Sequence, residues 1–433
     1  MKIKVLDKSY ADVMAIEPPK HDKPKKIPMA LRMLIKAISS ANLKKNNMKY
    51  TEHGMEKLGK DEPCLVLMNH SSFIDLQIAA DYLYPRPFST VCTSDAFIGK
   101  PFLMKLIGCI PTQKFVSDLT LIKDMSYALK KLGATVLMYP EASYSFDGTA
   151  TPLPDTMGKL LKLLKVPVVT IITHGAFARE PLYNMLRHRE VDITADVTYL
   201  LSPEQIANST PEELNDILND VFSFDNFAYQ QENNIIINED FRADGLERVL
   251  YKCPHCLSEG KNIGKGTTIK CTHCGKEYEL TELGSLRAIE GEQKFSHIPD
   301  WYAWEREEVK KEISEGKYLL DIDVEIMMVV DYKAVYRVGD GRLTHTKDGF
   351  HLVGCDGELD YTQSSLSSYS LYADYFWYEL GDMICIGNRR QLFYCFPKDP
   401  ESAIVAKARM ATEELYKIAI NDKRAKKNQK TQV

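Results

Sequence analysis

The sequence lacks the long apolar runs of a membrane-spanning protein. Its 433 residues contain no uninterrupted apolar stretch of about 18 residues, the length that a spanning helix needs. The N-terminal residues 1–7 also lack the apolar core of a signal peptide. These two absences predict a protein that stays in the cytoplasm.

A disulfide framework is also missing. Four of the ten cysteines form two Cys-x2-Cys pairs, and the other six are scattered. Several of the scattered cysteines lie in apolar runs, which predicts buried free thiols. These six are Cys64, Cys92, Cys109, Cys355, Cys385 and Cys395.

Acidic residues are scarce at the N-terminus. Residues 1–50 contain twelve Lys or Arg and four Asp or Glu, although the whole chain has a net charge of −5. Apolar residues recur here at helical spacing from Ile27 to Ile38, beside several lysines. Such a helix can lie on an anionic membrane surface at the inner face of the membrane, or it can pack on its own domain. The segment 1–50 is therefore a candidate membrane-surface segment.

A histidine and a carboxylate follow the apolar run 64–68. His70 and Asp75 lie five positions apart, with Ser71 and Ser72 between them. If His70 sits in the turn after a strand and Ser71 or Ser72 caps the next helix, Asp75 can bind one imidazole nitrogen. The other nitrogen would then take a proton from an alcohol, as a general base does. Taken alone, the pair could equally be a chance arrangement at the surface.

Three further blocks follow in order. They are Gly-Cys-Ile-Pro-Thr-Gln-Lys at 108–114, Tyr-Pro-Glu-Ala-Ser-Tyr-Ser at 139–145, and Val-Pro-Val-Val at 166–169. With Asn69-His70-x4-Asp75, these blocks resemble the glycerolipid acyltransferase family, whose best-known members are the 1-acylglycerol-3-phosphate acyltransferases. The resemblance covers roughly residues 50–205.

The resemblance implies roles for individual residues. His70 and Asp75 would be catalytic, and Asn69, Lys114, Glu141 and Ser143 would bind substrate. Glu141 would contact the glycerol hydroxyls of the acceptor or hold its own loop, and Lys114 would meet a phosphate as a point charge. Without the resemblance, the sequence indicates only a carboxylate in a turn for Glu141 and a solvated surface lysine for Lys114.

Some positions depart from the family pattern. Ala142 stands where Gly is usual, Tyr144 where many members have Arg, and Gln113-Lys114 where Asp-Arg is common. Because a guanidinium binds phosphate with two parallel hydrogen bonds, these changes affect the acceptor more than the acyl transfer itself.

The order of elements in residues 51–205 predicts an α/β domain. Candidate strands at 64–68, 88–93, 134–139 and 167–173 alternate with helical patterns at 74–83, 97–107, 117–132 and 156–165. This order predicts a mostly parallel sheet flanked by helices, with the site at the strand ends. The helix at 97–107 either lines an acyl-tail pocket or belongs to the core.

A helical extension at 206–248 precedes a second strong motif. Two Cys-x2-Cys knuckles fourteen residues apart match a zinc ribbon over residues 249–282. Four thiolates close the tetrahedron, so the zinc would be structural; His255 and His273 are alternative ligands. The predicted ligands are Cys253, Cys256, Cys271 and Cys274. The ribbon would brace the chain or bind a partner, and its mixed charge and few aromatic residues make nucleic acid an unlikely one.

The region 283–420 is rich in short alternating runs. Candidate strands lie at 318–330, 334–338, 342–346, 349–353, 366–372, 375–379, 382–387 and 391–396, with hairpin turns at Gly339–Gly341 and Gly387–Asn388. A helix covers about 400–420. This pattern resembles a pleckstrin-homology-like antiparallel β-barrel with a C-terminal helix, which could read a lipid headgroup, form a homodimer or pack on the chain. The basic tail 421–433 is predicted to be disordered.

The sequence therefore predicts a peripheral membrane O-acyltransferase of phospholipid biosynthesis. It would move a fatty acyl group from acyl-CoA or acyl carrier protein to the free hydroxyl of a lysophospholipid, with 1-acylglycerol-3-phosphate as the leading acceptor and phosphatidate as its product. Two alternatives remain open. They are transfer to another lipid or sugar hydroxyl, and a non-catalytic scaffold that keeps a degenerate acyltransferase core.

Overall fold

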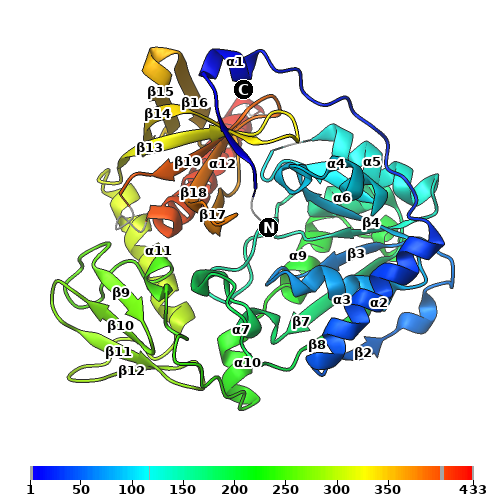
Figure 1. The fold of residues 1–433 in the computed structure, drawn as a ribbon, viewed down its shortest axis with the longest axis horizontal. Helices are drawn as coiled ribbons and strands as arrows, with labels where there is room; N and C mark the ends of the chain where they lie inside the picture. The colour runs from blue at the N-terminus through cyan, green and yellow to red at the C-terminus, as the bar shows by residue number, and fades with distance from the viewer. Residues whose placement is uncertain (1–2, 117, 400–403, 432–433) are drawn as a thin grey trace.

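The computed structural model describes residues 3–116, 118–399 and 404–431, with the backbone alone for 427–431. Three sheets organise these residues (Figure 1). The first belongs to the predicted α/β domain, the second to the predicted ribbon and the third to the β-rich region.

The α/β sheet has the strand order β2-β8-β7-β3-β6-β4-β5. All neighbouring pairs are parallel except β7 with β8, so the prediction of a mostly parallel sheet is confirmed. The strands are β2 (Lys49–His53), β3 (Leu65–Met68), β4 (Phe88–Thr93), β5 (Cys109–Thr112), β6 (Thr135–Met138), β7 (Val168–His174) and β8 (Thr194–Leu201). β3 is buried along its whole length, which explains its continuous apolar run.

Helices cover both faces of this sheet. They are α2 (Met29–Lys45), α3 (Ile74–Leu83), α4 (Pro101–Leu106), α5 (Leu119–Lys130) and α6 (Met157–Leu164). The predicted helix 97–107 is shorter than expected, because a 3-10 turn at Ser94–Phe97 precedes α4. The short helix α7 (Ala176–Arg179) lies between β7 and β8, and after β8 come α8 (Pro203–Asn208), α9 (Pro211–Val221) and α10 (Asn226–Glu232). α9 begins with the capping box of Thr210 and Glu213, as its sequence indicates.

The ribbon sheet has the order β12-β11-β10-β9. Its strands are β9 (Asn262–Lys265), β10 (Thr268–Cys271), β11 (Glu277–Leu280) and β12 (Leu286–Ala288). β12 lies beyond the expected boundary at residue 282. α11 (Ile298–Ser314) then leads to the β-rich domain.

The third sheet has the order β16-β15-β14-β13-β19-β18-β17 and is antiparallel along this path. Its strands are β13 (Leu320–Met328), β14 (Val335–Thr346), β15 (Gly349–Gly354), β16 (Leu359–Ser364), β17 (Tyr372–Trp377), β18 (Gly381–Gly387) and β19 (Leu392–Pro397). A long helix follows it. The likeness to a pleckstrin-homology barrel stays a prediction.

Two expectations for this domain are wrong in detail. Gly339–Gly341 is no hairpin turn, because β14 continues through it and pairs with β13 across a register shift at Ile326. A Cβ on Gly341 would lie 2.5 Å from the Ile326 side chain, so the glycine permits close packing rather than a turn. The expected strand 366–372 is also displaced, because β16 ends at Ser364 and β17 starts at Tyr372.

The C-terminal helix α12 (Ile404–Thr431) is longer than predicted. It continues through the basic stretch expected to be disordered, where Lys, Arg, Ala and Gln favour helix and neither Pro nor Gly interrupts it. The last two residues of that tail lie outside the described residues.

The N-terminal segment links the first and third sheets. β1 (Val5–Asp7) pairs in parallel with β14, so the predicted single unit 1–50 is divided. The chain passes through α1 (Tyr10–Met14) and an extended stretch before it reaches α2 (Figure 1). On this stretch His21 contacts Asp124 of α5, with 2.8 Å between Nε2 and Oδ2. We call residues 15–28 the strap.

No helix among the described residues is both long enough and apolar enough to cross a membrane.

Candidate active site

The site lies at the carboxyl ends of β3 and β6. His70 follows β3, and its Nδ1 lies 3.0 Å from Oδ2 of Asp75 in the first turn of α3. Asp75 is fully buried, whereas the His70 side chain is 20% exposed. With the proton on Nδ1, the imidazole donates to Asp75. Nε2 has no hydrogen bond among the described residues, so it can accept a proton.

One carboxylate oxygen of Asp75 accepts three hydrogen bonds. Oδ2 of Asp75 also accepts the backbone N–H groups of Ser71 at 2.8 Å and Ser72 at 3.0 Å. The expected serine cap of α3 is present only in part, because the Ser72 hydroxyl accepts the N–H of Ile74 at 3.4 Å, whereas Phe73 is the N-cap residue and its own side chain makes no cap bond. The carboxylate of Asp75 orders this turn.

Two tyrosines enclose the imidazole. The ring centroids of Tyr139 and Tyr144 lie 4.0 Å and 4.2 Å from that of His70. Burial between these rings lowers the pKa of His70, although Asp75 raises it. The neutral base is thus favoured at neutral pH. The sequence singled out Tyr144 only as a replacement for Arg, and nothing in the local pattern indicated Tyr139.

Glu141 holds two loops together. Its Oε1 accepts the backbone N–H of His70 at 3.1 Å, and its Oε2 accepts the N–H and hydroxyl of Thr151 at 2.8 and 3.1 Å. Burial raises the pKa of Glu141 to about 7, against the lowering effect of these bonds. Because both oxygens are engaged, the geometry favours the loop-holding role over a contact with acceptor hydroxyls.

The other predicted substrate ligands are placed differently. The Asn69 amide is fully buried and engaged with Thr173 of β7, with 2.8 Å from Thr173 N to Oδ1. It therefore joins β3 to β7 rather than facing a ligand. Ser143 is 2% exposed, and its buried hydroxyl has no partner within the described part of the chain.

Lys114 lies where the α/β domain meets the β-rich domain. Its Nζ is 4.3 Å from the ring centroid of Tyr372 in β17. Burial lowers the pKa of Lys114, and the carboxyls of Asp374 and Asp95 raise it. Lys114 in turn lowers the pKa of His70, so its charge acts on the His70–Asp75 pair.

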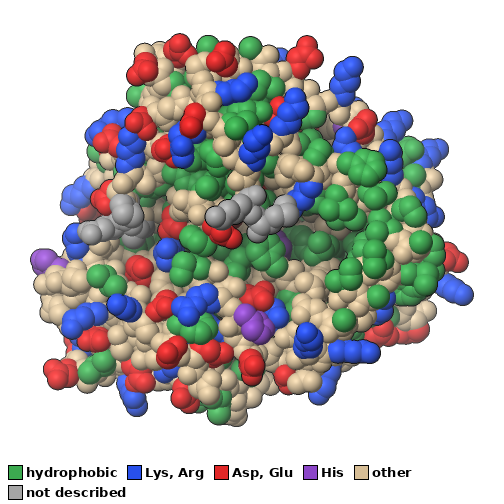
Figure 2. All heavy atoms as spheres, in the orientation of Figure 1, with side chains coloured by type: hydrophobic (Ala, Val, Ile, Leu, Met, Phe, Trp, Pro, Cys, Tyr) green, Lys and Arg blue, Asp and Glu red, His purple; other side chains and the backbone are tan. Residues whose placement is uncertain are grey.

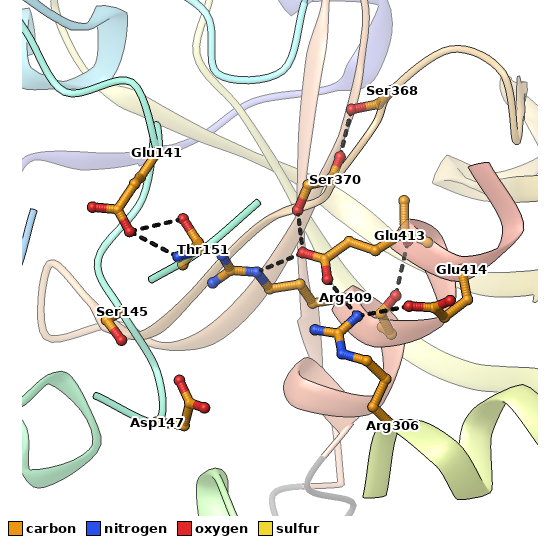
Figure 3. Close-up of polar contacts among 12 residues, drawn as sticks. Glu141, Ser145, Asp147, Thr151, Arg306, Ser368, Ser370, Arg409, Glu413 and Glu414 are labelled. Atoms are coloured by element: carbon orange, nitrogen blue, oxygen red, sulfur yellow. Dashed lines mark hydrogen bonds and ion pairs between the residues drawn. The ribbon is translucent and has the colours of Figure 1, made fainter. Parts of the chain in front are cut away.

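The C-terminal helix adds a cation that sequence reasoning missed. Arg409 of α12 is 3% exposed, lies 4.4 Å from the Phe146 ring centroid, and contacts Glu413 at 3.3 Å. Figure 3 shows this pair on α12 together with Glu141 and Thr151. Arg409 also lowers the pKa of Glu141. Residues 268 positions apart meet here, so no local pattern could have indicated the contact.

Asp374 gives this region a pH dependence. Burial raises the pKa of Asp374 from 3.8 to about 7. As pH rises, the Asp374 carboxyl therefore loses its proton in the unfolded chain before it does so in the folded protein. The free energy of unfolding consequently falls between about pH 4 and pH 7. We expect Asp374→Asn to gain stability relative to the unchanged protein across this window and to keep a constant difference above it. Urea unfolding at several pH values would measure this, and a pH-independent difference would contradict it.

The four predicted cysteine ligands converge. Their sulfur atoms all lie within 4.8 Å of one another, with 3.7 Å for Cys253–Cys274 and for Cys256–Cys271. A tetrahedron with Zn–S bonds of about 2.3 Å has edges of about 3.8 Å, so the cluster fits zinc. The alternative ligand His255 instead bonds the hydroxyl of Tyr278 at 2.8 Å. Four thiolates leave no open position, so a metal here would stabilise the fold.

Part of this chain is similar to known proteins. Residues 49–174 match the Acyltransferase family, and this stretch contains His70, Asp75, Lys114 and Glu141. Among solved structures, the 1-acyl-sn-glycerophosphate (LPA) acyltransferase PlsC from Thermotoga maritima is similar at 16% identity. That match covers 44% of this chain and 76% of PlsC, with a TM-score of 0.35.

Proposed function

We propose that this protein transfers a fatty acyl group from a thioester, on CoA or acyl carrier protein, to the free hydroxyl of a lysophospholipid. The observation that carries the proposal is the His70–Asp75 pair with its free Nε2, inside a segment that matches the Acyltransferase family. The simplest acceptor of this class is 1-acylglycerol-3-phosphate, which would give phosphatidate.

The chemistry starts at Nε2 of His70. This nitrogen takes the proton of the acceptor hydroxyl while the hydroxyl oxygen attacks the thioester carbonyl. The tetrahedral intermediate then expels the thiolate, which receives the proton from the imidazolium. Asp75 stabilises the imidazolium between the two steps. No acyl-enzyme forms, so donor and acceptor must be bound together.

The oxyanion needs hydrogen-bond donors. The backbone amides of Ser71 and Ser72, which directly follow His70, already bind Asp75. The amide of Phe73 has no hydrogen bond among the described residues, and the residue is 66% exposed. We assign this amide to the oxyanion.

A product assay tests the reaction. The purified zinc-containing protein would be incubated with acyl-CoA or acyl carrier protein donors and a panel of lysophospholipids, and the lipids followed by mass spectrometry. A new diacyl lipid that requires both protein and thioester is expected. No product from any pair, with folded protein and zinc bound, would favour the scaffold alternative.

An apolar face beside the site fits the expected membrane contact. Ile27 lies against Gly108, which brings the start of α2 close to the end of α4. At the start of α3, the ring centroid of Phe73 lies 6.0 Å from that of Tyr144. Figure 2 shows apolar side chains gathered on the side of the molecule where α2 and α4 lie. The exposed residues are Met29, Met33, Leu34, Ile38, Phe73, Leu76, Phe102, Leu103 and Leu106. The strap contains four lysines and contacts α4 where its Asp22 pairs with Lys105. Positive charge next to α4 suits an anionic bilayer.

Charged substitutions on this face should weaken membrane binding. Phe102 is 78% exposed, and burying such a ring contributes about 2 kcal/mol. We therefore expect Phe102→Glu to reduce co-sedimentation with phosphatidylglycerol vesicles at least about tenfold. The matched control is Ile263→Glu on the ribbon strand β9, where Ile263 is 51% exposed. Equal losses in both variants would contradict the assignment of the face.

A further inference from the structure

A cleft of about 640 Å³ lies between the α/β domain and the β-rich domain. Lys114, Phe115 and Val116 form one wall. The other wall comes from β16, the segment before β17, and the β18–β19 turn. Its volume is in the range of sites that enclose a whole small ligand.

Two cations that line the cleft form no ion pair within the described residues, although Lys114 lies over the Tyr372 ring. Neither the Lys114 ammonium nor the Arg390 guanidinium makes a hydrogen bond or ion pair with its side chain among the described residues. The neighbouring Arg389 differs, because its Nη2 lies 3.2 Å from Asp118 and 3.0 Å from the Thr120 hydroxyl. The cleft thus holds two positive groups on opposite domains.

Uncharged polar groups also line the cleft, among apolar residues such as Leu371 and Leu392. Gln363 accepts the Gly387 N–H at 2.8 Å through its oxygen, which leaves its NH2 group free to donate. The Ser367 hydroxyl has no side-chain hydrogen bond in the part of the chain that the structure describes. Such amides and hydroxyls bind the hydroxyl groups of a polyol.

The cleft and the His70–Asp75 pair lie at the same edge of the α/β sheet, because Lys114 follows β5, His70 follows β3, and β3, β6, β4 and β5 run parallel. Tyr372 lines the cleft and lies under Lys114, whose charge acts on His70. An acceptor whose hydroxyl meets His70 and whose phosphate meets Lys114 therefore directs the rest of its headgroup into the cleft. A phosphate monoester would leave the Arg390 end empty.

We propose that the cleft is a headgroup site and that the acceptor is a lysophospholipid whose phosphate is esterified to a polyol. Lys114 binds the phosphate, and Gln363, Ser367 and Arg390 of the β-rich domain bind the polyol. This inference rests on the proposed acyl transfer and narrows its acceptor beyond 1-acylglycerol-3-phosphate. It gives the β-rich domain a part in substrate selection.

Soluble headgroups test the site without the reaction. Calorimetric titration would compare glycerophosphoinositol and glycerophosphoglycerol with glycerol 3-phosphate. We expect at least one polyol diester to bind about tenfold tighter than glycerol 3-phosphate, a difference of roughly 1.4 kcal/mol. Arg390→Ala should remove most of that preference, and Lys347→Ala, in the β14–β15 turn of the same domain, should keep it.

The outcomes separate the two proposals. Equal binding of all three ligands, or an Arg390→Ala variant with the full preference, would overturn the headgroup site even if acyl transfer occurs. The expected binding pattern without turnover of any acceptor would uphold the site and contradict the acyl transfer. In a turnover assay, the ratio of kcat/KM for the polyol lysophospholipid to that for lysophosphatidate should fall in Arg390→Ala.

Discussion

His70→Ala is expected to lower kcat about 10³–10⁴-fold, because it removes the only base that faces the acceptor hydroxyl in our proposal. The fold should survive, since the His70 side chain makes a single hydrogen bond, to Asp75. Single-turnover lipid formation would measure the loss.

A second histidine–aspartate pair provides the control. In β15 of the β-rich domain, Nε2 of His351 lies 2.9 Å from Oδ1 of Asp360. His351→Ala removes a similar pair and should leave kcat within about twofold of the unchanged protein, as surface substitutions usually do. A similar loss in both variants would show that the effect is not catalytic.

Asp75→Asn separates charge from position. All three donors meet one oxygen of Asp75, and the other oxygen has no hydrogen-bond partner among the residues that the structure describes. An asparagine can therefore keep its amide oxygen in that place and hold the turn, while the negative charge is lost. We expect a loss of kcat of about 10²-fold or more and a lower pKa of His70, which moves the acid limb of the pH profile to lower pH. An unchanged acid limb would count against Asp75 as the partner of the base.

Loss of the metal is expected to have the largest effect on stability. A structural zinc in a four-cysteine site commonly contributes about 10 kcal/mol or more to folding. We expect Cys271→Ser, or removal of the metal with a chelator, to lower the melting temperature by at least about 10 °C. Differential scanning calorimetry with metal analysis of the same sample would measure this.

Loss of the metal should also lower the activity at the His70 site. The ribbon residue Glu259 pairs with Lys407 of α12 at 2.8 Å, two positions before Arg409. Trp301 of α11 donates to the carbonyl of Lys252 at 2.9 Å, next to the first knuckle. Activity should therefore fall with zinc content. Cys92→Ala is the matched control, because Cys92 lies in β4 outside the cluster. A Cys271→Ser variant that melts like the unchanged protein would contradict a structural metal.

Local patterns predicted much of the α/β domain. The strand at 88–93 and the helix at 74–83 have the bounds that the sequence indicated, because buried strands and helices with recurring apolar residues leave strong signals over a few residues. The four cysteines were found in the same way, since ligand spacing within a knuckle is local.

Contacts between distant segments could not be predicted. The pairing of β1 with β14, the approach of Arg409 to Glu141, and the cleft beside Lys114 all join parts of the chain that no short pattern relates. Gly341 shows the same limit at one residue. The glycine predicted a turn. It is required instead because a Cβ at this position would lie too close to the Ile326 side chain on the neighbouring strand.

The pairing of β1 with β14 sets an order for synthesis. Val5 leaves the ribosome 330 residues before its partner Val335. At about 5–20 residues per second, β1 waits on the order of 20–60 s before its place in the sheet exists. The α/β domain can fold during this interval while the strap is still free. The apolar face of α2 is therefore already accessible before the β-rich domain folds and completes the headgroup cleft.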